Sequence, residues 1–243
     1  HMFEGEKQVL KISFKKKVFK FKLNLIGKIQ IKNVLMAVLA ANKSKINFNK
    51  IVNVLHKIKP VEGRLEKIGK IYNNSRVILD YAHTPKALEL SLINLREQFP
   101  DSKIKLIFGC GGDRDFKKRF LMGKIAEKFS DQIYLTDDNP RSEKPSKIRK
   151  DIKKGIKKNN FNEIPDREVA IHKAIQNLNS GDILLVAGKG HEKIQDYGNK
   201  KIFFSDKKII LEAIKIKNKL LSKNLKLNII KEQSYKINFK DLL

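Results

Sequence analysis

The polar stretch Thr136-Asp137-Asp138-Asn139-Pro140-Arg141 directly follows the apolar run Gln132-Ile133-Tyr134-Leu135. Two carboxylates, an amide and a guanidinium placed so close together could bind a small ligand that carries both charge signs. Pro140 fixes its own φ at about −65° and pushes Asn139 toward an extended backbone, so the loop that carries these groups is stiff. The alternative is a strand that simply ends in a polar turn before the next helix.

Three further segments combine side chains that are suited to binding a ligand. They are Asp80-Tyr81-Ala82-His83, Gly109-Cys110-Gly111-Gly112-Asp113-Arg114-Asp115 and Gly188-Lys189-Gly190-His191-Glu192. Arg114 and Arg141 could bind carboxylates through their planar guanidinium groups, while Asp138 and Glu192 could hold an ammonium group. A small amino acid with additional charged groups would satisfy all four side chains.

Each of these segments also has a purely structural explanation. Asp80 and His83 could cap the helix that is expected to begin at Thr84-Pro85, and the glycines from 109 to 112 could form a flexible turn. Neither glycine-rich segment has dinucleotide or G-x-x-x-x-G-K-[ST] phosphate-loop spacing. The five histidines and the single cysteine have no zinc-binding spacing, so we predict no metal site in this sequence.

An alternation of strands and helices from residue 67 onward could bring the polar segments together. Apolar strands are expected at 77–79, 103–108, 133–136, 182–187 and 201–204, and helices at 84–99, 119–129, 145–158, 166–179 and 205–221. The pattern predicts an α/β fold with a Rossmann-like, mainly parallel sheet and helices on both faces. In such a sheet the carboxyl ends of the strands share one edge, where ligands bind.

Residues 1–66 follow a different pattern. Apolar residues alternate with lysines from residue 8 to residue 31, which predicts two or three antiparallel strands. Residues 34–41 are apolar nearly all round, as in a buried helix, and a second helix is expected at 49–59. We interpret 1–66 as the incomplete end of one domain, with His1-Met2 as a tag remnant. An α/β domain at 67–221 and a tail of uncertain structure at 222–243 follow.

Charge and composition narrow the class of protein. The net charge of +27 comes mostly from lysines spread along the chain and interleaved with Ile, Asn and Phe, a bias that A/T-rich codons explain. Because no aromatic-rich strand motif or recognition helix accompanies the charge, we do not expect nucleic acid as the main partner. A single cysteine and the lack of an apolar run of about 20 residues predict a cytoplasmic protein without a membrane span.

Taken in order, the four polar segments and Gly63-Arg64-Leu65-Glu66 resemble the C-terminal half of a Mur ligase. The resemblance extends over about residues 20–220, and Asp-Asn-Pro-Arg is the signature of the members that add meso-diaminopimelate. It implies that this amino acid is bound by Arg114, Asp138, Asn139, Pro140, Arg141, Gly188 and Glu192. It also implies that the residues facing ATP are Asn33, Arg64, Asp80 and His83.

The resemblance implies an ATP-dependent ligase of peptidoglycan synthesis that joins meso-diaminopimelate to UDP-N-acetylmuramoyl-L-alanyl-D-glutamate through an acyl phosphate. Residues 1–66 would be the tail of its central ATPase domain. ATP and Mg²⁺ would bind mainly to residues upstream of this chain, which contains no complete catalytic set. We expect the chain to be inactive alone and the full-length protein to be a monomer. The alternatives are a stand-alone binding module for a charged amino acid and a basic nucleic-acid binder.

Overall fold

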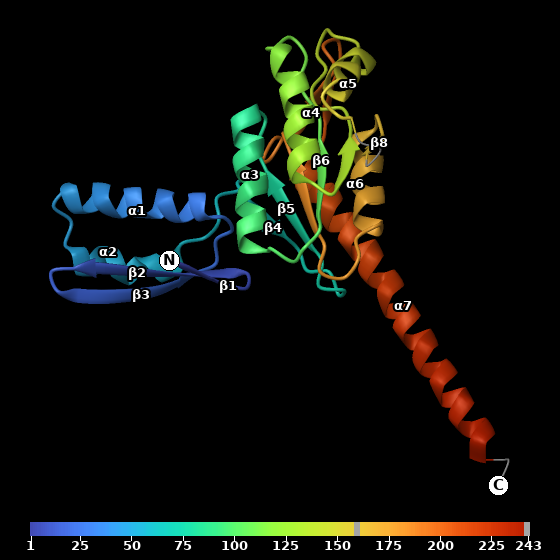
Figure 1. Cartoon of the computed structure of the whole chain (residues 1–243), viewed down its shortest axis with the longest axis horizontal. Helices are drawn as coiled ribbons and strands as arrows, with labels where there is room; N and C mark the ends of the chain where they lie inside the picture. The colour runs from blue at the N-terminus through green and yellow to red at the C-terminus, as the bar shows by residue number, and fades with distance from the viewer. Residues whose placement is uncertain (158–160, 241–243) are drawn as a thin grey trace.

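The computed structural model describes residues 1–157 and 161–240, with the side chains of residues 224–240 outside the description (Figure 1). The chain opens with an antiparallel sheet of order β1-β2-β3, formed by β1 (Met2–Glu4), β2 (Lys7–Phe14) and β3 (Lys17–Leu23). Lys15 and Lys16 connect β2 to β3 with φ angles of 46° and 63°, as a tight two-residue hairpin turn requires. The expected antiparallel strands are therefore confirmed for β2 and β3.

Helix α1 (Lys28–Lys43) begins earlier than the alternating pattern predicts, so Ile29 and Ile31 are helical rather than part of a strand. Gly27 turns the chain with a φ of 82°, and its N–H donates to Gln98 Oε1 at 2.8 Å. The N–H of Ile29 donates to Asn94 Oδ1 at 3.0 Å. These distant side chains satisfy backbone donors near the start of the helix, which otherwise lacks a side-chain cap.

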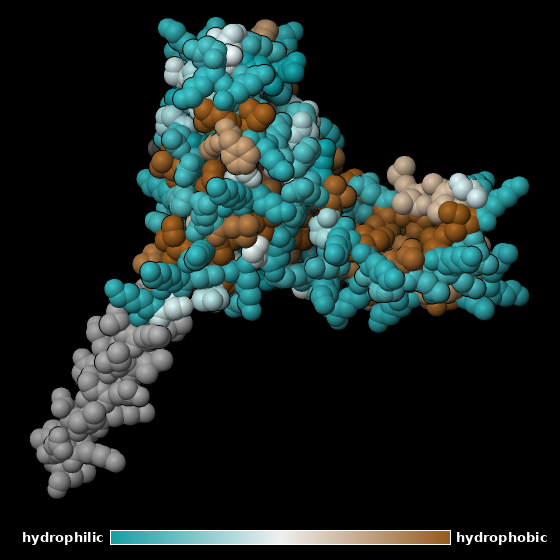
Figure 2. Space-filling view, turned by 180° about the vertical axis from the view of Figure 1, so that it is seen from behind, coloured by the Kyte–Doolittle hydropathy of each residue, from teal (hydrophilic) through white to brown (hydrophobic). Residues whose placement is uncertain are grey.

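The expectation that α1 is buried all round is wrong. Ile31, Val34 and Val38 face a small core, whereas Met36 and Leu39 are 69% and 63% exposed. Helix α2 (Phe48–Val54) and the 3₁₀ helix η1 (Leu55–Lys57) complete this part of the molecule, which we call the arm (residues 1–57). Figure 2 shows apolar colour gathered on the arm, away from the bulk of the molecule.

A six-stranded sheet organises the rest of the chain and has the order β4-β5-β9-β6-β7-β8. Its strands are β4 (Glu66–Ile68), β5 (Arg76–Asp80), β6 (Ile104–Phe108), β7 (Gln132–Leu135), β8 (Phe161–Glu163) and β9 (Ile183–Ala187). Only β4 is antiparallel to its neighbour, so the predicted mainly parallel sheet is confirmed. Strands β4 and β8 were not expected, because three residues are too few to show a clear apolar pattern.

Helices cover both faces of this sheet, as predicted (Figure 1). One face packs against α3 (Pro85–Gln98), α4 (Lys117–Phe129) and α5 (Pro145–Lys153), and the other against α6 (Arg167–Gln176) and α7 (Asp206–Lys240). Successive strand residues point to opposite helix layers. Ile78 faces the first layer, while Val77 and Leu79 face the second. Strands of this kind, buried on both faces, explain the continuous apolar runs in the sequence.

Two elements differ from the sequence pattern near the C-terminus. The strand expected at 201–204 does not join the main sheet; β11 (Lys201–Phe203) pairs with β10 (Ile194–Asp196) in a separate antiparallel ribbon. Helix α7 continues past residue 221, and the last part of the expected tail, 241–243, lies outside the described residues. Within the described chain, none of the helices combines the length and the apolar character that crossing a membrane requires.

Candidate functional site

A cleft of about 540 Å³ lies at the carboxyl ends of the parallel strands. Its lining contains six of the seven residues expected to bind the amino acid, namely Arg114, Asp138, Asn139, Arg141, Gly188 and Glu192. Tyr81, His83, Lys117, Lys118 and Leu121 also line it. The four polar segments therefore converge, as the parallel topology predicts. Pro140 is not part of the lining, and its carbonyl oxygen packs against Gly112.

The two adjacent carboxylates after β7 have different environments. Asp137 forms an ion pair with Arg149, which also donates to Glu163 Oε1 at 2.9 Å, and it does not line the cleft. Burial raises the pKa of the Asp137 carboxyl, while the hydrogen bond from Arg149 opposes this rise. Asp138 lines the cleft and lies against Gly188, whose φ is 115°. A side chain at position 188 would collide with the Asp138 carboxylate, so glycine allows this close approach.

A buried hydrogen-bond network supports one wall of the cleft. Lys189 is fully buried, and its Nζ donates to Asn139 Oδ1 at 2.9 Å and to Glu192 Oε2 at 3.1 Å. Asn139 Nδ2 also donates to Glu192 Oε2, at 2.9 Å. Sequence reasoning missed the role of Lys189, because the residues around it suggested only an imperfect phosphate loop. The available signal was the three-residue spacing of a lysine and a glutamate directly after a buried strand.

Arg141 is held by the glycine-rich loop that follows β6. Its Nη1 donates to the carbonyl oxygen of Gly112 at 2.7 Å, and the N–H of Gly112 donates to the carbonyl oxygen of Asn139 at 2.9 Å. A Cβ atom at Gly112 would overlap the carbonyl oxygen of Pro140. The two loops are therefore in direct backbone contact, and the alternative of a merely flexible glycine turn does not hold.

Arg114 extends from the same glycine-rich loop and is exposed in the cleft. Asp113 next to it accepts hydrogen bonds from the Ser142 hydroxyl at 2.6 Å and from the Ser142 N–H at 3.1 Å. The Ser142 hydroxyl lowers the pKa of the Asp113 carboxyl. Below this turn, the buried Arg119 donates to both oxygens of Glu143, at 2.7 and 3.0 Å. The base of Arg114 is thus anchored, while its exposed side chain lines the cleft.

The residues expected to face ATP are divided between two hollows. Asn33, Arg64 and Asp80 line a smaller hollow of about 210 Å³ where the arm meets the sheet, whereas His83 lines the cleft. The Arg64 guanidinium lies over the ring of Tyr81, with its central carbon 4.6 Å from the ring centroid. The Tyr81 ring also contacts His83, at 4.5 Å between centroids, so this aromatic side chain lies between the two groups.

The Asp80 carboxylate is engaged within the protein. It accepts hydrogen bonds from Ser91 Oγ at 2.5 Å and from the N–H groups of Tyr81 and Leu65 at 3.0 and 3.2 Å. Burial raises its pKa, and these hydrogen bonds oppose the rise. Thr84, not the pair of Asp80 and His83, caps helix α3 through its hydroxyl. Asp80 thus fixes the turn before β4, where Leu65 has a φ of 45°.

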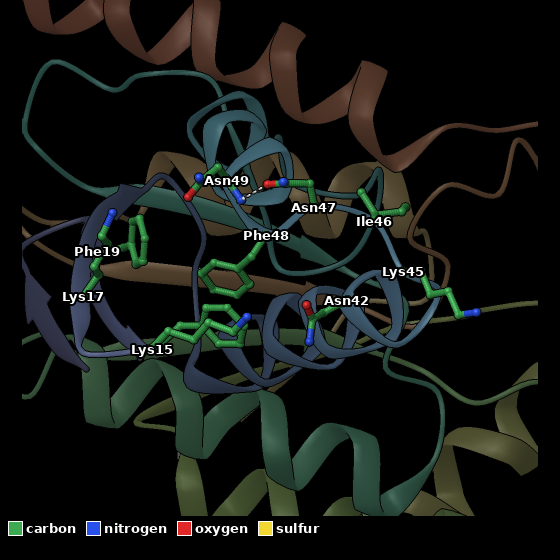
Figure 3. Close-up of a pocket in the computed structure, with 10 residues that line it drawn as sticks. Lys15, Lys17, Phe19, Asn42, Lys45, Ile46, Asn47, Phe48 and Asn49 are labelled. Carbon is green, nitrogen blue, oxygen red and sulfur yellow. Dashed lines mark hydrogen bonds between the residues drawn. The ribbon is translucent and has the colours of Figure 1, made fainter.

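A different hollow of about 380 Å³ lies at the tip of the arm (Figure 3). Its charged lining residues are Lys15, Lys17 and Lys45. Phe48 stacks on Phe14 with 4.0 Å between ring centroids, and the lining includes no carboxylate. The arm hollow would suit an anion, and it lacks the second charge sign that a zwitterion needs.

Comparison with known proteins identifies the family. A family model described as "Mur ligase, glutamate ligase domain" matches residues 63–190, more than half of the 243 residues. The chain belongs to the Mur ligase family. This Mur ligase chain is 42% identical over 228 residues to the UDP-N-acetylmuramoyl-L-alanyl-D-glutamate–2,6-diaminopimelate ligase of Rickettsia felis. It is 48% identical over 195 residues to the ligase of the same name from Buchnera aphidicola.

The Mur ligase chain spans only part of these relatives. The Rickettsia alignment covers 89% of this chain and 42% of the relative, and the Buchnera alignment covers 80% and 38%. A solved UDP-N-acetylmuramoyl-L-alanyl-D-glutamate–2,6-diaminopimelate ligase matches with a TM-score of 0.65 and 32% identity, over 86% of this chain and 42% of its own. The family resemblance inferred from the motifs is confirmed, and the chain is a homologue of the diaminopimelate-adding ligases.

Proposed function

We propose that this chain is the amino-acid-binding part of a longer ATP-dependent ligase. The ligase adds meso-diaminopimelate to UDP-N-acetylmuramoyl-L-alanyl-D-glutamate in peptidoglycan synthesis. The observation that carries the proposal is the charge pattern of the cleft, which combines the guanidinium groups of Arg114 and Arg141 with the carboxylates of Asp138 and Glu192. The names of the Rickettsia and Buchnera relatives contain UDP-N-acetylmuramoyl-L-alanyl-D-glutamate and 2,6-diaminopimelate.

The chemistry of the amino acid fits this charge pattern. Meso-diaminopimelate carries an ammonium group and a carboxylate at each end, whereas lysine lacks the second carboxylate. Planar guanidinium groups bind carboxylates through paired hydrogen bonds, so Arg141 and Arg114 hold the distal carboxylate. Asp138 and Glu192 hold the ammonium at that end. The amine at the other end remains outside this charge pattern, where it can act as the nucleophile.

In the proposed reaction, ATP phosphorylates the D-glutamyl carboxylate of the acceptor. The free amine then attacks the carbonyl carbon of the acyl phosphate, the bond to the phosphate oxygen breaks, and the amine loses a proton as the amide forms. The chain's part is to hold the amine in position for this attack, which lowers the entropic cost of bringing the reactants together. Asn33, Arg64, Asp80 and His83 would form one wall of the ATP site, with Asp80 acting by fixing the Arg64 turn.

The longer protein would require Mg²⁺ together with ATP. Across the part of the chain that the structure describes, no three His, Cys, Asp or Glu side chains come together in a group that could hold a metal ion. We propose that the residues that hold Mg²⁺ lie mainly in other parts of the longer protein. ATP would supply the phosphoryl group that activates the carboxylate.

Calorimetry on this chain with meso-diaminopimelate, L-lysine and a DNA duplex tests the proposal. We expect meso-diaminopimelate to bind with measurable heat, and L-lysine to bind with an affinity at least tenfold lower. Equal affinity for the two amino acids would instead favour a general binding module for charged amino acids. Binding to DNA alone would show that the lysine-rich surface, and not the cleft, carries the function.

A second measurement concerns ATP. The sequence contains no G-x-x-x-x-G-K-[ST] loop, which is the usual cradle for the phosphates of ATP. We expect no ATP hydrolysis above background from the purified chain, with or without Mg²⁺ and meso-diaminopimelate. Sustained turnover that co-purifies with the chain would contradict the assignment of the phosphate site to another part of the protein.

A further inference from the structure

Lys189 is a charged side chain beside the cleft, and none of its surface is exposed. It follows β9 directly, and its Nζ donates to Asn139 Oδ1 at 2.9 Å, Glu192 Oε2 at 3.1 Å and the carbonyl oxygen of Ile194 at 2.6 Å. An ammonium group has three protons and no lone pair, so these three acceptors use all of its hydrogen-bonding capacity. Lys189 therefore has no donor left for a ligand.

The contact with Lys189 determines which way the Asn139 amide faces. Asn139 Oδ1 accepts from Lys189 Nζ and also from the N–H of Asp196 at 3.0 Å. Two donors on one side can be satisfied only by the carbonyl oxygen, so the amide nitrogen must face the other way. One N–H of this nitrogen donates to Glu192 Oε2 at 2.9 Å. Because Asn139 also lines the cleft, we expect the second N–H to meet a ligand there.

The same contacts determine how Glu192 is presented. Its Oε2 accepts from both Lys189 and Asn139, which leaves Oε1 as the acceptor for a ligand in the cleft. A buried ammonium is costly unless it is paired, and Glu192, whose side chain is 31% exposed, supplies the opposite charge. The ion pair therefore connects Glu192, which faces the ligand, to Lys189, which does not.

We infer that Lys189 is a positioning residue that orients the ligand-binding groups of Asn139 and Glu192 in the cleft. It keeps a donor at Asn139 for a carboxylate of the ligand, and an acceptor at Glu192 for an adjacent ammonium. This arrangement recognises the amino acid centre of the substrate, so the inference rests on the proposed function. Without Lys189, the amide loses one of the two donors that orient it, and the Glu192 carboxylate loses its fixed partner.

The test uses Lys189→Met, which keeps most of the side-chain volume, and Lys105→Met as a matched control. Lys105 is also buried and paired, with its Nζ 2.8 Å from Asp182 Oδ2, but it lies at the amino end of the sheet on β6. We expect Lys189→Met to weaken binding of meso-diaminopimelate about tenfold to a hundredfold, as loss of hydrogen bonds to charged groups does. Lys105→Met should change this affinity less than about twofold, although it also lowers stability.

A ligand-free measurement separates this inference from the proposed function. In the wild-type protein, NMR should show slowly exchanging side-chain amide protons for Asn139 and a protected ammonium signal for Lys189. The Asn139 amide protons should exchange faster in Lys189→Met and stay unchanged in Lys105→Met. If the wild type bound no meso-diaminopimelate, the proposed function would fail, while these signals would still report on the positioning contact.

Several results would overturn the inference. One is that a folded Lys189→Met variant binds meso-diaminopimelate with wild-type affinity. A second is that Lys105→Met loses as much affinity as Lys189→Met. A third is that the Asn139 amide protons exchange at the wild-type rate in Lys189→Met. If Lys189→Met did not fold, the wild-type ammonium signal would decide the question. Exchange of the Lys189 protons as fast as those of exposed lysines would then rule out the network.

Discussion

The cleft at the sheet edge and the hollow at the tip of the arm are both rich in cations, but they differ in how the charges are arranged. In the cleft, Arg114 and Arg141 share one lining with Asp138 and Glu192. In the arm hollow, lysines surround phenylalanine rings without any carboxylate in the lining. The comparison shows that a net charge of +27 does not by itself define a site. The proposed site is defined instead by opposite charges that the parallel sheet brings together.

The space around the backbone glycines also differs between the cleft and the arm. This difference leads to the largest expected effect. Gly112→Ala should destabilise the protein by about 3 kcal/mol, because the new methyl group overlaps the carbonyl oxygen of Pro140. Gly5→Ala in the arm meets open space and costs only the left-handed backbone, about 1 kcal/mol. Urea unfolding of both variants measures the difference. Equal costs would mean that the contact between the two loops is easily relieved.

The second prediction compares a cation from each region. Arg141→Ala should weaken binding of meso-diaminopimelate by up to about a hundredfold, since a hydrogen-bonded pair of charges is lost. It should also remove most of the preference over L-lysine, which lacks the second carboxylate. Lys17→Ala, at the arm hollow, is the control and should leave both affinities unchanged. Calorimetry measures these affinities, and an unaltered preference in Arg141→Ala would refute the assigned role.

The smallest expected effect concerns Glu6, whose ion pairs join the arm to the main sheet. Its carboxylate pairs with Arg76 at 2.7 Å and with Lys67 at 2.5 Å, next to the main sheet. Burial raises the pKa of Glu6, but the hydrogen bonds from Lys67 and Arg76 outweigh burial and leave the pKa below its usual value of 4.5. The stability that Glu6 contributes is therefore fully present above about pH 4.5 and is lost as the pH falls through the lower folded pKa.

Glu6→Gln provides the matching variant for this pH dependence. It should be slightly less stable than the wild type at pH 7, and the difference should shrink as the pH falls below about 4.5. Thermal unfolding of both proteins as a function of pH measures this. A stability difference that stays constant down to pH 3 would show that the ion pairs contribute nothing to the junction.

Local signals in the sequence were sufficient for most of the fold. The helix starts expected at 84 and 166 agree with the caps that Thr84 and Asp166 form on α3 and α6, because a cap depends on residues only three positions apart. The buried strands were visible as continuous apolar runs. The start of α1 was not predicted, because the partners of its first turn, Asn94 and Gln98, lie more than 60 residues away.

The sequence by itself determined the family, the mainly parallel sheet and the convergence of four polar segments, since parallel strand direction follows from the alternation of strands and helices. The tertiary structure alone decided which polar side chains face the cleft. It directs Asp137 to Arg149 and Asp138 toward Gly188, and it engages both oxygens of Asp80. It also buries Lys189 under Asn139 and Glu192. Beyond the end of a strand the side chains no longer alternate regularly, so their directions depend on partners that are distant in the chain.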